Sequence, residues 1–417
     1  MGNKRARKLK GFPTLNKGQN EALDLFDDWF KNGGYKKKPI LRIGGAAGSG
    51  KSVLINVIRA LYDLDETSCY VVAYTGQAVS VLRRRGVHAK TIHSTFMHTT
   101  QVPLRDDKNR IIKKDGIPLM TFKFKPLECI PSNVELIICD EYSFVPEELQ
   151  KMMLKFHVPI LAVGDPFQLP PVAGKQCFAM EDLDYILTEV MRQDKDNEIL
   201  KLATCIRERE PIYFSDYGNQ VVFANPKSTV EETFQAFRAC FQYTDITITT
   251  TNKQRQIITD CYRREVVKTD SPYPVKGERM ICRRNDWQLR IGDIPLTNGM
   301  MGICMEDIPR SDIKRKDGVY YMDFKPLYVA NNYFDKLMCN HKFLLDRFGD
   351  KTITKFDRGH MIEFGWAITT HLSQGAEFNT VTFMDTYNRD EDYMSRLRYT
   401  AVTRATDHLV YVLPYLI

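Results

Sequence analysis

The sequence predicts an α/β fold built on parallel sheets that helices cover on both faces. Short, continuous apolar runs rich in Val and Ile recur along the chain, with helix-like patterns between them. Strands buried between two helical layers have this character. The runs that we expect to form strands are residues 38–43 (KPILRI), 69–75 (CYVVAYT), 134–141 (VELIICDE), 158–165 (VPILAVGD), 245–251 (DITITTT), 379–385 (NTVTFMD) and 408–413 (HLVYVL).

Composition indicates a soluble protein of several domains. A chain of 417 residues, 43% of them hydrophobic, is expected to fold as about two to four domains. No apolar run approaches the roughly 18 residues that a membrane span needs. The ten cysteines are scattered without a C-x-x-C pair, which is typical of free thiols in a reducing compartment. We therefore expect a cytoplasmic protein, in the host cytoplasm if a phage encodes it.

Three segments depart from the α/β pattern. Residues 1–13 begin with a cluster of Lys and Arg and are expected to be a solvated basic tail. Residues 99–128 are polar with a Lys-Asp-Gly turn between alternating residues, which predicts a β-hairpin. Residues 306–360 contain a second Lys-Asp-Gly at 316–318 and are expected to form a small β-rich insertion. The net charge of +7 permits a polyanionic partner.

A glycine-rich loop follows the first strand. Gly45, Gly48, Gly50, Lys51 and Ser52 lie in the pattern G-x-x-x-x-G-K-S, and the residues after it have helical spacing. Backbone N–H groups of such a loop wrap a chain of phosphates at a helix N-terminus. Lys51 would reach the β- and γ-phosphates of ATP, and Ser52 would hold Mg²⁺.

Acidic and amide side chains lie at the ends of two later predicted strands, residues 134–141 and 158–165. Asp140 and Glu141 come directly after a buried strand, where ligands bind in parallel sheets. Asp140 is expected to hold the Mg²⁺, and Glu141 to polarise the attacking water. Gln168 follows a Gly-Asp turn one strand later and can reach the γ-phosphate or its water.

These motifs resemble those of superfamily 1 helicases. Residues 44–52, 139–143 and 163–171 resemble motifs I, II and III in that order. Residues 187–193 (LTEVMRQ) resemble the stretch that supplies the arginine of motif IV, and residues 369–381 and 399–406 resemble motifs V and VI. The sequences of residues 91–96 (TIHSTF) and 164–172 (GDPFQLPPV) are most similar to those of the 1B branch, the RecD and phage Dda-type helicases.

The resemblance, which extends over residues 14–409, implies two RecA-like domains with ATP between them. The first would span residues 14–190, with the hairpin at 99–128 as a wedge that splits the duplex. The second would span residues 191–417, with the insertion at 306–360. It also implies that Arg192 and Arg404 reach the γ-phosphate from the second domain when the cleft closes. Gln19, in a stretch similar to the Q motif, would read adenine.

Candidate contacts to nucleic acid lie in four stretches. The phosphate or base contacts that the resemblance implies are Thr75, Gln77, Thr91, His93, Ser94, His371, Ser373 and Gln374. The chain departs from the family pattern at Tyr74, where Pro is usual, and at Leu372, where many relatives have Lys. Strand alternation places Phe122 and Phe124 on one face of the hairpin, where they could stack on bases or serve only in packing.

The sequence therefore favours an ATP-driven helicase that moves 5′ to 3′ on single-stranded DNA and separates duplexes in replication, recombination or repair. We expect a monomer whose partners are single-stranded DNA, duplex junctions and, as candidates, single-strand-binding or replisome proteins, with no membrane partner. One alternative is an RNA-directed translocase or remodeller. Another, from a different class, is a P-loop kinase or a nucleotide-gated interaction module.

Overall fold

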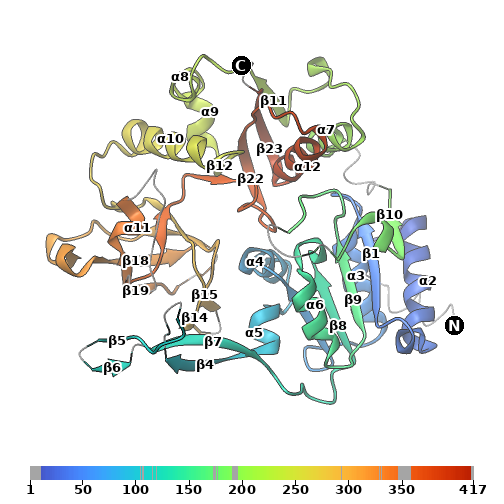
Figure 1. The fold of residues 1–417 in the computed structure, drawn as a ribbon. Helices are drawn as coiled ribbons and strands as arrows, with labels where there is room; N and C mark the ends of the chain where they lie inside the picture. Colours follow the sequence, from blue (N-terminus) through green and yellow to red (C-terminus); the bar gives the residue numbers. More distant parts are fainter. Residues whose placement is uncertain are drawn as a thin grey trace.

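The computed structural model describes residues 11–414 except for 104, 106–107, 115, 119, 172–174, 176, 190–195, 293, 328, 330 and 346–357. Two parallel sheets lie next to each other, and an antiparallel sheet and a long hairpin lie beside them (Figure 1). The helices gather around the two parallel sheets. The α/β class predicted from the sequence is thereby confirmed.

The first parallel sheet has six strands. In spatial order they are β10 (Tyr185–Leu187), β1 (Ile40–Gly45), β9 (Ile160–Gly164), β8 (Leu136–Asp140), β2 (Cys69–Ala73) and β3 (Ala89–Thr91). Every pairing between neighbours is parallel. The carboxyl ends of these strands therefore meet at one edge, where ligands bind in such sheets.

Helices cover both faces of this sheet, because successive side chains of a strand point to opposite faces. Leu136 and Ile138 of β8 belong to a buried cluster with α2 (Lys17–Lys31), α3 (Lys51–Leu61) and α4 (Gly76–Arg84). Ile137 and Cys139 belong to a second cluster, with α5 (Ile92–Phe96) and α6 (Glu147–Leu154). This sheet and helices α2–α6 are called the first sheet domain below.

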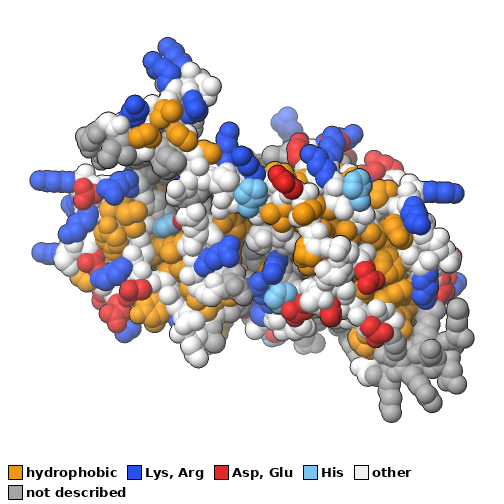
Figure 2. All heavy atoms as spheres, turned by 90° about the horizontal axis from the view of Figure 1, so that it is seen from below, with side chains coloured by type: hydrophobic (Ala, Val, Ile, Leu, Met, Phe, Trp, Pro, Cys, Tyr) orange, Lys and Arg blue, Asp and Glu red, His pale blue; other side chains and the backbone are white. Residues whose placement is uncertain are grey.

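The hairpin leaves the first sheet domain after α5. Strands β4 (Met97–Pro103) and β7 (Met120–Pro126) pair antiparallel over seven residues each, and β5 (Lys113–Lys114) and β6 (Ile117–Pro118) pair nearer the tip. It runs along the bottom of the molecule (Figure 1). The face seen from below carries Lys and Arg side chains between patches of hydrophobic ones (Figure 2).

The second parallel sheet has five strands. Their order is β11 (Val221–Ala224), β23 (Ala405–Val412), β22 (Phe378–Met384), β12 (Ile246–Thr249) and β21 (Ala367–Thr369). One face packs on α7 (Glu198–Glu208) and α12 (Glu391–Val402). The other packs on α8 (Val230–Ala236), α9 (Arg238–Tyr243) and α10 (Asn252–Tyr262). This sheet and these helices are called the second sheet domain.

An antiparallel sheet is inserted between α10 and β21. Its strands are β17 (Ile313–Lys314), β18 (Val319–Pro326), β16 (Met301–Cys304), β13 (Arg279–Cys282) and β20 (Ile362–Phe364), and β19 (Phe334–Asn340) pairs with β18. The ribbon β14 (Asp286–Ile291) and β15 (Ile294–Leu296) and the helix α11 (His341–Leu345) complete this β-rich domain. It begins at about residue 279, earlier than the 306 expected from the sequence, because β13 to β16 are too short and too mixed in polarity to resemble buried strands.

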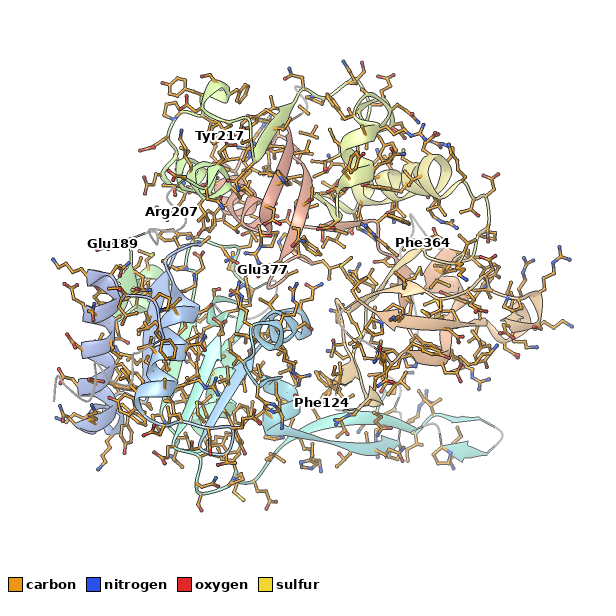
Figure 3. All side chains as sticks on the ribbon, turned by 180° about the vertical axis from the view of Figure 1, so that it is seen from behind. Phe124, Glu189, Arg207, Tyr217, Phe364 and Glu377 are labelled. Carbon is orange, nitrogen blue, oxygen red and sulfur yellow. The ribbon has the colours of Figure 1, made fainter. Side chains whose placement is uncertain are left out.

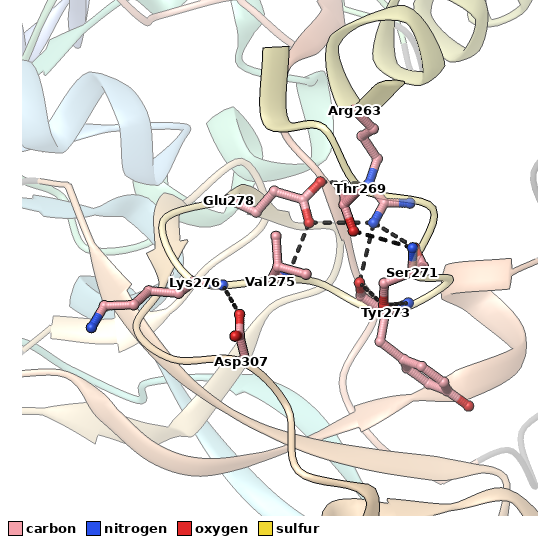
Figure 4. Close-up of polar contacts among 8 residues, drawn as sticks. All are labelled: Arg263, Thr269, Ser271, Tyr273, Val275, Lys276, Glu278 and Asp307. Atoms are coloured by element: carbon pink, nitrogen blue, oxygen red, sulfur yellow. Dashed lines mark hydrogen bonds and ion pairs between the residues drawn. The ribbon is translucent and has the colours of Figure 1, made fainter. Parts of the chain in front are cut away.

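Buried ion pairs join the β-rich domain to the second sheet domain. A π-helical turn (Arg263–Val267) extends α10, and the Arg263 guanidinium lies 3.9 Å from the ring of Phe364, at the end of β20 (Figure 3). Arg263 Nε donates to Glu278 at 2.5 Å, and both side chains are almost fully buried. Arg263 also donates to the carbonyl oxygens of Ser271 and Tyr273 (Figure 4). Because buried charges are tolerated only when they are paired, the junction is well defined.

The seven runs predicted to be strands each contain one, namely β1, β2, β8, β9, β12, β22 and β23. The short strands β3, β10, β11 and β21 complete the two parallel sheets. Among the helices of the described residues, none has both the length and the apolar character of a membrane span.

Candidate nucleotide site and nucleic-acid interface

The glycine-rich loop connects β1 to α3 at the carboxyl edge of the first sheet. Gly50 precedes α3 with φ of +80°, a left-handed conformation that strongly favours glycine. Lys51 Nζ donates to the carbonyl oxygens of Gly45 at 2.7 Å and Ala46 at 3.0 Å. The ammonium group is thereby held across the loop, where incoming phosphate oxygens would meet it.

A cavity of about 410 Å³ lies between the two sheet domains at this loop. The first sheet domain contributes Gly48, Gly50, Lys51, Ser52, Asp140, Glu141 and Gln168 to its lining, and the second contributes Gly375, Glu377, Thr403 and Arg404. Gly45 ends β1 just behind this lining. The structure thus brings together most of the residues predicted to bind and hydrolyse ATP.

Asp140 ends β8 at the wall of the cavity, and Glu141 follows it directly. The Glu141 N–H donates to Asp140 Oδ1 at 2.9 Å, and Glu141 has φ of +50°. Burial, reinforced by the charge of Asp140, raises the pKa of Glu141 to about 7, against the opposing charges of Arg404 and Lys51. Burial also raises the pKa of Asp140. Glu141 Oε2 is buried with no hydrogen-bond partner among the described residues, so it is available to a ligand or water.

Ser52 and Asp140 fit a divalent cation. A hydroxyl oxygen and a carboxylate are ligands that Mg²⁺ prefers, and both residues line the same cavity. Burial raises the pKa of Asp140, and the charge of Lys51 opposes that rise, so the ammonium group and the carboxylate lie within electrostatic reach of each other. The donor set therefore suits a magnesium-bound triphosphate.

Gln168 and Arg404 reach the cavity from opposite domains. Gln168 is 4% exposed, its Nε2 lies 3.4 Å from Asp165 Oδ2, and its Oε1 has no partner among the described residues. Arg404 donates through Nε to Thr400 O at 2.9 Å and through a terminal nitrogen to Ala376 O at 3.1 Å. These bonds orient the guanidinium, and its charge acts on Glu141 across the cleft.

One predicted nucleotide contact, Gln19, has a different place in the structure, and another, Arg192, is not among the described residues. Gln19 is fully buried in a capping box with Asn16, and its Nε2 donates to Gly50 O at 3.2 Å. It thus supports the phosphate loop from behind and does not line the cavity. Arg192 lies outside the described residues.

Sequence reasoning missed the contacts that join the two domains around the cavity. The Ala47 N–H donates to the hydroxyl of Tyr399 at 2.8 Å, and that hydroxyl donates to Asp165 at 2.7 Å. Arg85, just after α4, contacts Ser52 at 3.0 Å and Glu377 at 2.8 Å. Pairs so distant in the chain leave no local pattern in a single sequence.

The start of α4 lies at the interface between the domains. Thr75 is its N-cap, accepting from the Ala78 N–H at 3.1 Å. A Cβ on Gly375 would lie 2.8 Å from Thr75 Oγ1, so the second sheet domain approaches this cap closely. Gln77 Nε2 donates to Gly299 O of the β-rich domain at 2.7 Å. In this structure Gln77 therefore joins two domains, in place of the phosphate contact expected of it.

An aromatic cluster joins α5, the hairpin and the β-rich domain. The ring of His93 stacks on Trp287 of β14 at 5.9 Å and lies 5.7 Å from Phe124 of β7, and Phe124 and Trp287 meet edge to face at 5.7 Å. Tyr74 lies 6.1 Å from His93. Burial lowers the pKa of His93, which favours the neutral ring. Trp287 was missed because its strand has no continuous apolar run.

Phe124 is 40% exposed and lies at the base of the hairpin in Figure 3. The indole N–H of Trp287 is buried and has no hydrogen-bond partner among the described residues. The cluster thus offers ring faces and one unused donor, which suits stacking on nucleic-acid bases. The side chain of Phe122 lies outside the described part of the structure.

Thr91 is the N-cap of the short helix α5, and Ser94 lies in its first turn. Thr91 Oγ1 accepts from the Ser94 N–H at 3.1 Å and is largely buried, whereas Ser94 is exposed and bonds Thr91 O at 3.0 Å. Ser94 remains accessible to a phosphate. Thr91 positions it.

Two predicted contacts in residues 371–374 require correction. Ser373 is fully buried and donates to Thr370 O at 2.8 Å, so it closes the local turn. Gln374 is 8% exposed and donates to Leu169 O at 3.2 Å, so it joins the two sheet domains. Neither side chain is therefore accessible to nucleic acid in this structure. Gln374 is held against Leu169 of the first sheet domain. His371 is partly exposed and stacks on Tyr393 at 6.3 Å.

Comparison with known proteins shows which families and structures the chain resembles. Residues 15–221 match the family described as AAA domain, and residues 364–412 match the UvrD-like helicase C-terminal domain. Over 136 residues the chain is 32% identical to the ATP-dependent DNA helicase Pif1 of Campylobacter jejuni, a match that covers 31% of this chain and only 28% of that protein.

Solved Pif1 structures from Bacteroides extend the likeness to nearly the whole chain. The complex with ADP-AlF3 and single-stranded DNA is 18% identical, with a TM-score of 0.52, and covers 97% of this chain and 95% of that one. The complex with single-stranded DNA alone is 17% identical, with a TM-score of 0.51 and the same coverage. Residues 15–221 thus match an AAA domain and residues 364–412 a UvrD-like helicase C-terminal domain, and the chain as a whole has the fold of the solved Pif1 structures.

Proposed function

We propose that the chain is an ATP-dependent helicase that moves along single-stranded DNA and separates duplex DNA. The observation that carries this proposal is the cavity between the sheet domains, where the phosphate loop, the two acids of β8 and Arg404 meet. An arginine that reaches the site from the second domain suits hydrolysis that is coupled to domain closure. A simple kinase would need an acceptor pocket there.

Each residue that lines the cavity would have its own role in ATP hydrolysis. Ser52 and Asp140 would hold Mg²⁺, which neutralises charge on the β- and γ-phosphate oxygens when it is bound. Lys51 compensates the phosphate charge from the loop, and Glu141 orients the attacking water and accepts its proton. Arg404 contributes positive charge as the cleft closes, when charge develops in the transition state.

A second group of residues, outside the lining of the nucleotide cavity, supports a grip on single-stranded DNA. Thr75, Ser94, His93 and Phe124 lie along α4, α5 and the hairpin, and Trp287 faces them from the β-rich domain. Hydroxyl groups can bond phosphates, and stacked rings can hold bases without reading sequence. The hairpin would then act as the wedge that separates the second DNA strand from the strand that is gripped.

Relatives support the substrate. The matched proteins are described as a DNA helicase and as Pif1 bound to single-stranded DNA. We extend this to a monomer that moves 5′ to 3′ in the cytoplasm of its cell, or of the host if phage-encoded. Roles in replication, recombination or repair, with single-strand-binding or replisome proteins as partners, belong to the same proposal.

The test is ATP hydrolysis with and without oligo-dT, followed by unwinding of duplexes that carry a 5′ or a 3′ tail. We expect oligo-dT to stimulate hydrolysis and 5′-tailed DNA to be unwound, with Lys51→Ala inactive in both assays. Preference for RNA duplexes would favour an RNA-directed remodeller. Hydrolysis indifferent to nucleic acid would contradict the proposal and favour a kinase or a nucleotide-gated module.

A further inference from the structure

Arg85 spans the two sheet domains at the metal-binding end of the cavity. Its Nη1 donates to Ser52 Oγ at 3.0 Å, and its Nη2 donates to both carboxylate oxygens of Glu377 at 2.8 Å. Ser52 belongs to α3, whereas Glu377 directly precedes β22. Figure 3 shows Glu377 between the two domains. One side chain thus contacts the phosphate-loop helix and the second sheet domain at once.

The backbone of Arg85 is fixed on the first sheet domain. The backbone N–H of Arg85 donates to the carbonyl oxygens of Leu82 at 3.1 Å and Val81 at 3.3 Å, which fixes the residue at the end of α4. Its donors lie in a rigid planar fork. A shift of Glu377 relative to α4 must therefore change the contact with Ser52, or break one of the two.

The contact with Ser52 competes with the metal. The Ser52 hydroxyl is the oxygen assigned above to Mg²⁺, and an arginine N–H already uses it as an acceptor. A guanidinium and a divalent cation on one oxygen would repel each other strongly at such short range. Binding of the metal therefore requires Arg85 to leave Ser52.

We propose that Arg85 is a positioning residue that transmits the arrival of Mg²⁺ and ATP to the second sheet domain through Glu377. Arg85 holds Ser52 and Glu377 together through these contacts. Metal and nucleotide displace it from Ser52, which releases the constraint between α4 and the segment before β22. The inference rests on the proposed ATP site, and it adds the residue that senses whether the metal position is filled.

Linkage fixes the sign of the effect. A contact that must break on binding lowers the affinity for the metal–nucleotide complex, so its removal raises that affinity by the same factor. Arg85→Ala should therefore bind a non-hydrolysable fluorescent ATP analogue more tightly in Mg²⁺, by about fivefold or more. In EDTA the gain should vanish, because the competitor of Arg85 is the metal. Arg84→Ala, which removes an equal charge from the adjacent residue, is the control and should bind like the wild type.

A second readout reports the domain contact without nucleotide. Amide hydrogen exchange over residues 375–384 should rise in Arg85→Ala and in Glu377→Gln. The double variant should show no further increase, because each change disrupts the same Arg85–Glu377 contact. Exchange that adds in the double variant would overturn the proposal.

The binding experiment separates the two hypotheses. Failure of the wild-type protein to bind the analogue in Mg²⁺ would contradict the ATP site itself. If the wild type binds while Arg85→Ala matches the Arg84→Ala control, Arg85 has no sensing role. Weaker binding by Arg85→Ala would make it a phosphate ligand and would also overturn the proposal.

Discussion

Replacing Phe124 or Trp287 by Ala should uncouple the hairpin from the β-rich domain and slow strand separation more than ATP hydrolysis. The two rings meet edge to face, with centroids 5.7 Å apart and planes at 86°. Such pairs contribute about 0.5–1.5 kcal/mol beyond the area that they bury. Phe124 is 40% exposed, so we expect the lower half of that range.

That energy sets the size of the effect. At 1.4 kcal/mol per tenfold, loss of the pair energy alone, about 0.5–1 kcal/mol, lowers the ratio of docked to undocked hairpin about two- to fivefold, and the buried area lost with either ring adds to this. Single-turnover unwinding should fall by a similar factor, whereas oligo-dT-stimulated hydrolysis, which depends on the cleft, should hold. In a double-mutant cycle the two substitutions should be non-additive by about the pair energy. Tyr243→Ala, at an exposed aromatic far from the cluster, is the control.

Additive effects in the cycle would show that the two rings act independently and that the hairpin is not held by the β-rich domain. An equal loss of hydrolysis and unwinding would instead place the cluster in the grip on the translocating strand. Binding of single-stranded DNA, measured by anisotropy, distinguishes these outcomes. A stacked base would add about 1–3 kcal/mol to the binding free energy.

Three further outcomes are expected. Lys51→Ala and Glu141→Gln should each abolish ATP hydrolysis, while a filter-binding assay finds that only Glu141→Gln retains ATP; residual turnover near the wild-type rate would contradict the site. Arg404→Ala should lower kcat severely and leave the ATP dissociation constant largely unchanged, since its contact strengthens in the closed, reacting state. Shortening the hairpin tip around residues 114–116 should preserve streptavidin displacement, which reports translocation, and reduce strand release; unchanged strand release would place duplex separation elsewhere.

Local patterns in the sequence identified the parallel sheets and the part of the candidate site that lies on the first sheet domain. A buried parallel strand is apolar throughout, so β1, β8 and β9 could be recognised one at a time. The phosphate loop and the Asp140–Glu141 pair are likewise contiguous in the chain. Their chemistry is encoded within a few residues, and the fold merely brings the pieces to one edge.

Contacts between distant segments escaped the same reasoning. Arg85 and Glu377 are 292 positions apart, and each looks like an ordinary surface charge in its own segment. Trp287 lies on a strand of mixed polarity whose neighbours cannot be foreseen from spacing. Ser373 and Gln374 matched a motif in type, yet tertiary packing directs one side chain into a turn and the other onto Leu169.

The buried ion pair between Arg263 and Glu278 determines how a movement of the cleft would spread through the molecule. Together with Glu363, which pairs with Arg255 at 3.0 Å and with Arg283, it binds the β-rich domain to the second sheet domain as one body. Breaking such pairs costs several kcal/mol, about 3–5 for each, so rotation of the second sheet carries β14 with it. Rotation of the second sheet at the phosphates would therefore displace Trp287 relative to Phe124 at the base of the hairpin, the ring that it meets edge to face.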